Sequence, residues 1–521
     1  MVSVAVNPPL RPSPESTVAP AAATTTATTV TTPKRFAIFT LGCKVNSFES
    51  EHLAQQLSRQ GHRRVDAHAA ADLCLINTCT VTAAADRQAR QLVRRAIRRH
   101  PAARIVVTGC YAQMDAAACA AIPGVDAVVG NARKLDIPAL LRPLLAGAGE
   151  STGELASESA GELPPTVPKV VVDDFAALDR DLSVPSELLG GFDGRARAFV
   201  QVQQGCDRGC TFCIIHQARG PSRSFPPDRV CAQVEKLAAN GFREVVICGV
   251  DVGSYGDDFG DDWRGDVGAD FPTDSGEPLA ELLRRLASID RGVRLRLSSI
   301  DPAHITDSLI DLIAAGALCP QLHLSLQSAD TLILKRMRRR ANRDMIYERI
   351  AALRRAAPHL TLSADILVGF PTETAAQFRR TLAAVDDLEI AWPHVFAYSP
   401  RRGTPAARIP SPRQVPPAER KQRAAAVRAM GRAVWERVAK RRIGARLKVL
   451  VEGRVATPAT AATVATAAAP EITGMAHPTR ARAADYFPVL FDARAPAPSG
   501  QFAAVEVTAV GDGVLIARQR A

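Results

Sequence analysis

The sequence of 521 residues has no apolar run that approaches the ~20 residues of a membrane-spanning helix, so we expect no membrane partner. Aromatic residues make up only 5% of the chain, which argues against a surface that stacks broadly on nucleobases. Eleven cysteines are too sparse, and odd in number, for the disulfide framework of a small secreted protein. Together these shortages predict a protein of a reducing compartment, the cytoplasm, whose cysteines serve metal or redox chemistry.

Positive charge is in excess, because 65 lysines and arginines face 53 acidic residues and give a net charge of +12. This balance suits a polyanionic partner, although an arginine-rich solvated surface produces the same balance. The length predicts about two to four domains. Residues 1–33 lack the charged start and continuous apolar core of a signal peptide, and their Ala, Thr and Pro content predicts a disordered tail.

Residues 34–145 predict a Rossmann-like α/β domain, in which short β-rich runs alternate with helical stretches. The strands are expected at 35–40, 73–77 and 105–108, and the helices at 50–60 and 83–99. Each strand is followed within two or three residues by a cysteine: Cys43, Cys79 and Cys110. Because functional groups of open α/β sheets gather beyond the carboxyl ends of the strands, we expect these three cysteines to converge.

A low-complexity linker is predicted for residues 146–190, and a second domain for residues 191–442. Six strand candidates alternate there with helical segments, which indicates a partial (βα)6 barrel with its chemistry on the loops after the strands. The candidates are residues 198–203, 244–248, 294–297, 321–326, 362–368 and 394–398. A basic helix at 416–442 leads into residues 443–521, whose short β runs predict a small antiparallel β-barrel.

The first loop of the predicted barrel carries three closely spaced cysteines, Cys206, Cys210 and Cys213. Three thiolates can hold a cubane 4Fe–4S cluster and leave one iron open to a substrate or cofactor. With His216, the same cysteines could instead form a Cys3His zinc site. The cluster interpretation is favoured, because structural zinc usually stabilises small domains without a core and this loop opens a large barrel. The Asp-rich stretch 251–274 lacks EF-hand spacing and is interpreted as a flexible insertion.

Motifs along most of the chain, from about residue 34 to residue 518, resemble those of the radical S-adenosylmethionine (SAM) methylthiotransferases. The N-terminal motifs are TLGCKVNSFESE (40–51), INTCTVT (76–82) and TGCYAQ (108–113). The barrel motifs are VQQGCDRGCTFCIIHQARGPSRS (202–224), GVDVGSYGDD (249–258), LHLSLQS (322–328) and ADILVGFPTET (364–374). The resemblance implies the fold predicted above, with a TRAM-like β-barrel at the C-terminus.

The resemblance also implies two 4Fe–4S clusters and SAM as cofactors. Cys206, Cys210 and Cys213 would hold the cluster whose open iron binds SAM and whose reduced form cleaves the sulfonium bond of SAM, so that the cofactor supplies the radical. A second cluster, which supplies the sulfur of the methylthio group, would be held by Cys43, Cys79 and Cys110. The residues expected at the SAM pocket are Phe212, Gly249 and Ser328.

The stretches GCKVNSFES, LSLQSADTLILKRMRRR and GVDVGSYG resemble the branch that acts on N(6)-threonylcarbamoyladenosine in tRNA. That branch adds a methylthio group to C2 of the adenosine 3′ of the anticodon, at position 37. His216-Gln217 and Ala329 depart from the Pro-Tyr and Gly that the family usually has near the SAM pocket. Isopentenyladenosine in tRNA and an aspartate of a ribosomal protein are alternative substrates, and a non-catalytic, zinc-stabilised RNA-binding protein is the alternative outside the enzymes.

The expected partners are tRNA, SAM, a sulfur donor and an electron donor, the last two of unknown identity. Basic clusters at 87–99, 335–340 and 437–442 and the TRAM-like barrel favour RNA, bound mainly through its backbone phosphates. Tyr486 and Phe487 are the candidates for stacking on a base. Because the C-terminal β pattern contains none of the six ligand cysteines, residues 444–521 are predicted to be a separable module.

Overall fold

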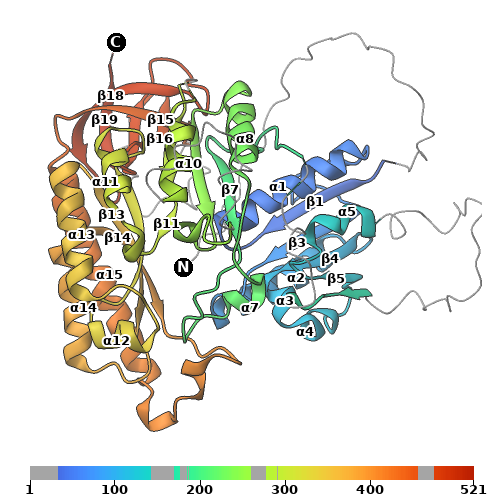
Figure 1. Cartoon of the computed structure of the whole chain (residues 1–521). Helices are drawn as coiled ribbons and strands as arrows, with labels where there is room; N and C mark the ends of the chain where they lie inside the picture. Colours follow the sequence, from blue (N-terminus) through green and yellow to red (C-terminus); the bar gives the residue numbers. More distant parts are fainter. Residues whose placement is uncertain are drawn as a thin grey trace, which may run out of the picture. The chain divides into compact units, whose positions relative to one another are not determined.

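The structure is a computed structural model of the chain and describes residues 33–141, 169–175, 185, 187–259, 277–289, 292–455 and 475–520 (Figure 1). Two compact units are present, Met1–Pro185 and Ser186–Ala521. Nearly all of the predicted tail and the first part of the predicted linker lie outside the described residues. No helix in the described ranges is long and apolar enough to cross a membrane.

The first unit contains a six-stranded parallel sheet with the strand order β2-β1-β3-β4-β5-β6. The strands are β1 (Arg35–Thr40), β2 (Arg63–Arg64), β3 (Leu73–Thr78), β4 (Arg104–Gly109), β5 (Ala127–Val129) and β6 (Lys169–Val171). The helices are α1 (Lys44–Arg59), α2 (Ala83–Arg99), α3 (Cys110–Met114), α4 (Ala116–Ala120) and α5 (Ile137–Leu140). The three strands predicted from the sequence are confirmed within one residue at each end, and helix 83–99 is confirmed as α2.

Both faces of this sheet are buried, as is usual for parallel sheets covered by helices. Phe36, Leu75 and Val106 pack in one apolar cluster, whereas their chain neighbours Ala37, Ile76 and Val107 pack in another. Two elements of this unit, one helix and one strand, differ from the sequence prediction. Helix α1 begins at Lys44 rather than at residue 50, and β6 lies within the segment predicted as a linker, where it pairs with β5.

The second unit begins with six parallel-running strands that follow one another in chain order, which confirms the partial (βα)6 barrel. They are β7 (Ala198–Gln204), β9 (Glu244–Gly249), β10 (Arg294–Leu297), β12 (Gln321–Gln327), β13 (Thr361–Val368) and β14 (Ile390–Ala397). Ser298 interrupts the ladder after β10, so that the short β11 (Ser299–Ile300) pairs with β12 and the barrel wall consists of two four-stranded sheets. The short β8 (Arg223–Ser224) pairs antiparallel with β7.

Helices lie between the barrel strands along the chain, and one further helix follows the last strand. They are α7 (Ile215–Arg219), α8 (Pro227–Ala239), α10 (Pro278–Ala287), α11 (Asp307–Ala314), α12 (Thr331–Arg336), α13 (Arg343–Ala356), α14 (Ala375–Asp387) and α15 (Pro417–Lys440). Local capping defines several starts: Thr374 and Gln377 form a reciprocal capping box at the beginning of α14. The predicted basic helix at 416–442 is confirmed as α15.

The C-terminal segment forms a closed five-stranded barrel with the order β15-β16-β17-β19-β18. The strands are β15 (Arg446–Arg454), β16 (Pro478–Ala483), β17 (Pro488–Asp492), β18 (Phe502–Val510) and β19 (Leu515–Gln519). The predicted small β-barrel is confirmed, but its description as antiparallel is wrong for one pair, because β17 and β19 pair in parallel. A ring with an odd number of strands cannot alternate direction at every pairing, so five strands require at least one parallel pair.

The C-terminal barrel shares a hydrophobic core with the (βα)6 barrel before it, which argues against a separable module. Val434 and Trp435 of α15 pack in one cluster with Phe487, which is completely buried. The rings of Trp392 and Phe487 lie 4.9 Å apart. Phe487 therefore cannot stack on a base, and Tyr486 packs against Trp392 with its ring centroid 5.8 Å away.

Candidate functional site

The three N-terminal cysteines lie at one edge of the first sheet. Cys43 precedes α1, Cys79 follows β3, and Cys110 is the first residue of α3. The strands that position them, β1, β3 and β4, are neighbours in the sheet, and all are parallel. The sheet therefore brings together three residues that are separated by 36 and 31 positions along the chain. The strand-end argument correctly placed them at a common edge.

Close backbone approaches hold the loops that carry these cysteines. Gly109 has φ 97°, and a Cβ at this position would lie 2.4 Å from the carbonyl oxygen of Thr78. The Asn46 side-chain amide donates to the carbonyl of Leu41 at 2.6 Å and to that of Thr78 at 3.0 Å. Asn46 thus ties the loop before Cys43 to the strand before Cys79.

A second asparagine contacts the triad directly. The Asn131 amide, just after β5, donates to Cys110 Sγ at 3.5 Å. Hydrogen bonds to sulfur are among the contacts by which proteins tune an iron–sulfur cluster. Sequence reasoning missed Asn131, because 21 residues separate it from Cys110 and no local pattern connects them. Asn46 lies inside the quoted GCKVNSFES motif and could have been noticed there.

The cysteines of the second unit lie in the loop after β7, at the carboxyl end of the first barrel strand. Gly205 precedes Cys206 with φ 73°, and a Cβ there would lie 1.7 Å from the carbonyl oxygen of Pro221. The Cys206 amide donates to the carbonyl of Gly220 at 3.0 Å, which fixes the start of the loop. Cys210 is buried, whereas Cys206 and Cys213 are half-buried.

Two arginines lie beside this second triad. Arg208 binds Asp251 through Nε at 2.7 Å, and the Cys206 thiol lies 3.8 Å from the same carboxylate. Burial, together with Asp251, raises the pKa of the Cys206 thiol to about 12. Arg339 donates to Cys210 Sγ at 3.7 Å and forms an ion pair with Asp301 at 2.9 Å. A metal must therefore displace a proton from Cys206 when it binds.

Asp251 corrects the interpretation of the Asp-rich stretch as a plain insertion. Its backbone amide donates to Gln203 Oε1 at 2.8 Å, and its carboxylate binds Arg208 beside the cysteine loop. The signal was available in the motif GVDVGSYGDD, where Asp251 lies two residues after the end of β9. The later part of the stretch, residues 260–274, lies outside the described residues.

The donor atoms around Cys206 are not gathered for a single zinc ion. Tetrahedral zinc with Zn–S bonds of about 2.3 Å requires sulfurs roughly 3.8 Å apart. Across the described part of the chain, no three ligand atoms from Cys206, Cys210, Cys213 and His216 lie within 4.8 Å of one another. Each of these cysteines is a thiol and not part of a disulfide.

Two family models match the chain, Uncharacterized protein family UPF0004 over residues 35–130 and Radical SAM superfamily over residues 200–385. Threonylcarbamoyladenosine tRNA methylthiotransferase MtaB of Rickettsia prowazekii is 39% identical over 418 residues, 80% of this chain and 87% of that protein. MtaB of Bacillus subtilis is 38% identical over 72% of this chain and 75% of that protein. The chain belongs to the radical SAM tRNA methylthiotransferases.

Other methylthiotransferases are similar too. The tRNA-2-methylthio-N(6)-dimethylallyladenosine synthase of Sorangium cellulosum is 36% identical over 81% of this chain and 82% of that protein. Among solved structures, the radical SAM methyltransferase TsrM of Kitasatospora setae covers 72% of this chain and 77% of its own, with 17% identity and a TM-score of 0.46. As a radical SAM tRNA methylthiotransferase, the protein uses SAM and carries two 4Fe–4S clusters.

The three residues expected at the SAM pocket of the methylthiotransferase have distinct surroundings. Phe212 packs edge to face on Phe370, with 6.5 Å between the ring centroids. Gly249 ends β9, where a Cβ would lie 2.9 Å from Gln203 Oε1. Ser328 is completely buried, and its hydroxyl lies 3.1 Å from that of Thr381. The described contacts are therefore structural for each residue, and their part in SAM binding stays a prediction.

Proposed function

We propose that this methylthiotransferase converts N(6)-threonylcarbamoyladenosine at position 37 of tRNA into its 2-methylthio derivative, by methylthiolation of C2. The observation that carries the proposal is the similarity to relatives named for this substrate, at 39% and 38% identity. N(6)-dimethylallyladenosine, the isopentenyl form, is the second candidate, favoured by a relative of 36% identity that is named for it. The reaction also requires a sulfur donor and an electron donor, and we place it in the cytoplasm.

We assign the two clusters to the two cysteine triads. Cys206, Cys210 and Cys213 would hold the cluster that binds SAM, and Cys43, Cys79 and Cys110 would hold the second one. When bound and reduced, the first cluster cleaves SAM to a radical that reacts with the substrate. Around the first triad, Arg208 and Arg339 are pre-positioned by carboxylates, so they place positive charge beside an anionic cluster.

Exposed positive charge next to the cysteine loop supports tRNA as the partner. Lys335, Arg336, Arg338 and Arg340 are exposed on and just after α12. Thr211, between the second and third cysteines of the loop, donates through its hydroxyl to the carbonyl of Arg336 at 2.8 Å. Phosphates bound at this basic cluster would bring a neighbouring nucleotide to the carboxyl ends of the barrel strands.

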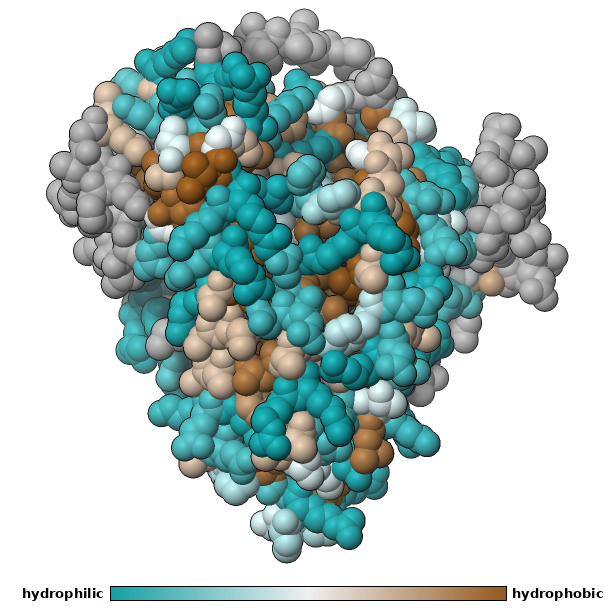
Figure 2. Space-filling model, turned by 90° about the vertical axis from the view of Figure 1, so that its left-hand side faces the viewer, coloured by the Kyte–Doolittle hydropathy of each residue, from teal (hydrophilic) through white to brown (hydrophobic). Residues whose placement is uncertain are grey.

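A cavity of about 900 Å³ extends the basic cluster of α12. Arg336, Arg380 and Arg413 line it, together with the first residues of α14. Hydrophilic residues predominate on the face of the molecule that carries α13, α14 and α15 (Figure 2). Because Glu373 and Glu419 also line the cavity and Arg380 pairs with Asp330 at 2.6 Å, the exposed arginines on and just after α12 are the better candidates for phosphate contacts.

The arginines of the third basic cluster predicted from the sequence are engaged in ion pairs with carboxylates of the fold. Arg437 pairs with Asp386 at 2.7 Å, and Arg442 pairs with Asp485 at 2.9 Å. Arg441 pairs with Glu389. These arginines stabilise the attachment of α15, so they offer less charge to RNA than the cluster on α12.

The substrate is tested by supplying the reconstituted enzyme with tRNA that carries either N(6)-threonylcarbamoyladenosine or N(6)-isopentenyladenosine. Nucleoside mass spectrometry should show a methylthio product from the first tRNA only. A product from the isopentenyl tRNA alone would contradict the proposed substrate but leave the reaction class intact. The same analysis of tRNA from a deletion strain should show loss of the 2-methylthio nucleoside and its return on complementation.

The tRNA surface is tested with Arg338→Ala/Arg340→Ala and with Arg437→Ala as a control at an arginine that is already ion-paired with Asp386. Titration of tRNA at several salt concentrations should show weaker binding by the double variant and a salt slope reduced by about one for each phosphate that is no longer neutralised. The control should retain the slope of the unmodified protein. Equal slopes for all three proteins would contradict binding at α12.

A further inference from the structure

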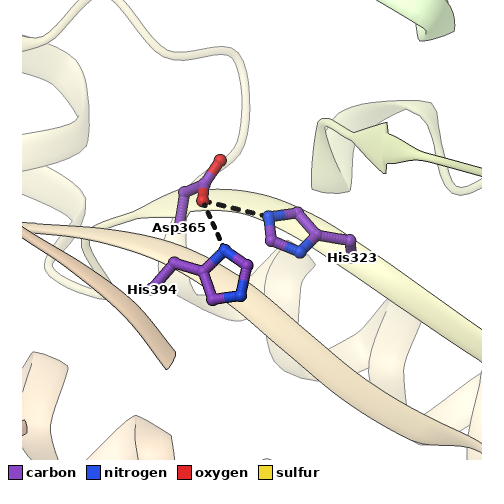
Figure 3. Close-up of side chains that lie close together, drawn as sticks. All are labelled: His323, Asp365 and His394. Atoms are coloured by element: carbon purple, nitrogen blue, oxygen red, sulfur yellow. Dashed lines mark ion pairs between the residues drawn. The ribbon is translucent and has the colours of Figure 1, made fainter. Parts of the chain in front are cut away.

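Three side chains outside both cysteine triads converge on neighbouring strands of the barrel. His323 lies on β12, Asp365 on β13 and His394 on β14, and Figure 3 shows both imidazole rings directed at one carboxylate oxygen. His323 Nε2 lies 3.0 Å from Asp365 Oδ1, and His394 Nδ1 lies 3.6 Å from the same atom. Over the described residues this is the one group of three His, Cys, Asp or Glu ligand atoms within 4.8 Å of one another.

The strand alternation places this group away from the apolar packing. Leu322, Leu324 and Leu326 of β12 are almost completely buried, so His323 between them points to the opposite face of the sheet. Asp365 and His394 are direct partners in the β13–β14 ladder, which brings their side chains to the same face. The exposed fraction of the side chain rises from 13% for His323 to 26% for Asp365 and 55% for His394. The group is therefore firmly held at one end and open at the other.

The three ligand atoms are spaced for a single metal ion. A triangle with sides of 3.0 and 3.6 Å and a third side of at most 4.8 Å has a centre no more than roughly 2.4 Å from each corner. Bonds from zinc to histidine nitrogen or carboxylate oxygen are about 2.0–2.2 Å long. An ion could thus reach all three atoms after shifts of a few tenths of an ångström, without a change of strand register.

An outer hydrogen bond orients the most buried ligand. His323 Nδ1 lies 2.9 Å from the hydroxyl of Ser363, which also accepts from the Gln321 amide at 3.0 Å. Histidine ligands usually have their second ring nitrogen fixed by such a partner.

We propose that His323, Asp365 and His394 form a binding site for one divalent transition-metal ion, of the Fe²⁺ or Zn²⁺ class, separate from the two iron–sulfur clusters. Two imidazoles and one carboxylate with open positions are a ligand set typical of such ions. The exposed edge at His394 leaves the remaining positions to water or to an oxygen or nitrogen atom of a bound molecule. This site is not part of the proposed methylthiolation. Its occupancy by a metal ion can therefore be measured without that reaction.

The test uses the full-length protein with both clusters reconstituted and loosely bound metal removed by gel filtration. Mn²⁺ alone is the probe, and its free concentration is followed by electron paramagnetic resonance. We expect one saturable site, from which Zn²⁺ displaces Mn²⁺ because zinc binds such ligands more tightly. Asp365→Asn and His394→Gln should each weaken Mn²⁺ binding at least tenfold. Ser363→Ala, which removes only the outer hydrogen bond, should weaken it about tenfold or more.

His359→Gln is the matched control, because this histidine is exposed and outside the group. The control should bind Mn²⁺ as the unmodified protein does, and all variants should retain their iron content and circular dichroism. The proposal is overturned if the unmodified protein shows no saturable site below millimolar Mn²⁺, or if Asp365→Asn and His394→Gln bind with unchanged affinity. In either case the group is an ion-paired hydrogen-bond network and not a metal site.

Discussion

Replacing Gly109 by alanine should separate the two clusters of this methylthiotransferase. Gly109 ends β4, directly before Cys110, and its φ of 97° is a conformation that residues with a side chain rarely adopt. The new Cβ would lie 2.4 Å from the carbonyl oxygen and 2.5 Å from the amide nitrogen of Thr78. Both are backbone atoms of the paired strand β3, so neither can move without disturbing the ladder that positions Cys79 and Cys110.

The magnitude follows from comparison with Gly61, which has φ 86° and nothing within 4 Å of an added Cβ. Gly61→Ala should cost only the backbone strain of the left-handed region, about 1–2 kcal/mol. Gly109→Ala should add the cost of overpacking, typically about 1–3 kcal/mol, for a total of roughly 2–5 kcal/mol. A loss of this size is a large part of the ~5–15 kcal/mol that stabilises a typical protein.

The assay reconstitutes both variants anaerobically and measures iron per chain, SAM cleavage, methylthio product and the melting temperature of the protein. Gly109→Ala should retain about half of the iron and cleave SAM without forming product, whereas Gly61→Ala should retain both clusters and activity. The reasoning is refuted if Gly109→Ala binds iron and forms product as the unmodified protein does. It is also refuted if the two variants melt at the same temperature.

Three further changes test other parts of the structure. Replacing Cys206, Cys210 and Cys213 by alanine should remove about half of the iron and abolish SAM cleavage; full iron with intact cleavage would contradict the ligand assignment. Three arginines outweigh the effect of burial and lower the pKa of Glu244 to about 2 from 4.5, so this carboxylate contributes stability above pH 4.5 that is lost as the pH falls toward 2. Glu244→Gln should therefore lower stability at pH 7 by on the order of 3 kcal/mol, and its difference from the unmodified protein in thermal unfolding should shrink below pH 4.5. Trp435→Ala should destabilise the shared core by about 3–5 kcal/mol in denaturant unfolding, and a change below about 1 kcal/mol would show that α15 and the β-barrel do not depend on each other.

Periodic patterns allowed the prediction of most elements but not of all. Strand β16 was missed because its sequence, PTRARA, alternates arginine with small residues and contains no large apolar side chain. It is a strand because both neighbours in the closed barrel supply hydrogen-bond partners. In the same way, β6 is only three residues long and is stabilised by its pairing with β5. Local sequence cannot reveal an element whose stability comes from distant partners.

The sequence by itself determined which six cysteines are candidate ligands, the order of most strands and helices, and the motifs that resemble the methylthiotransferases, because these depend on residue type and short-range spacing. Only the tertiary structure decided which distant groups surround those cysteines. Asn131 reaches Cys110 and Arg339 reaches Cys210 through contacts that no spacing rule encodes. The group of His323, Asp365 and His394 has the same origin, since parallel strands align residues about 30 to 40 positions apart. Sheet register and barrel closure are collective properties of many strands, so they position side chains in ways that no local segment specifies.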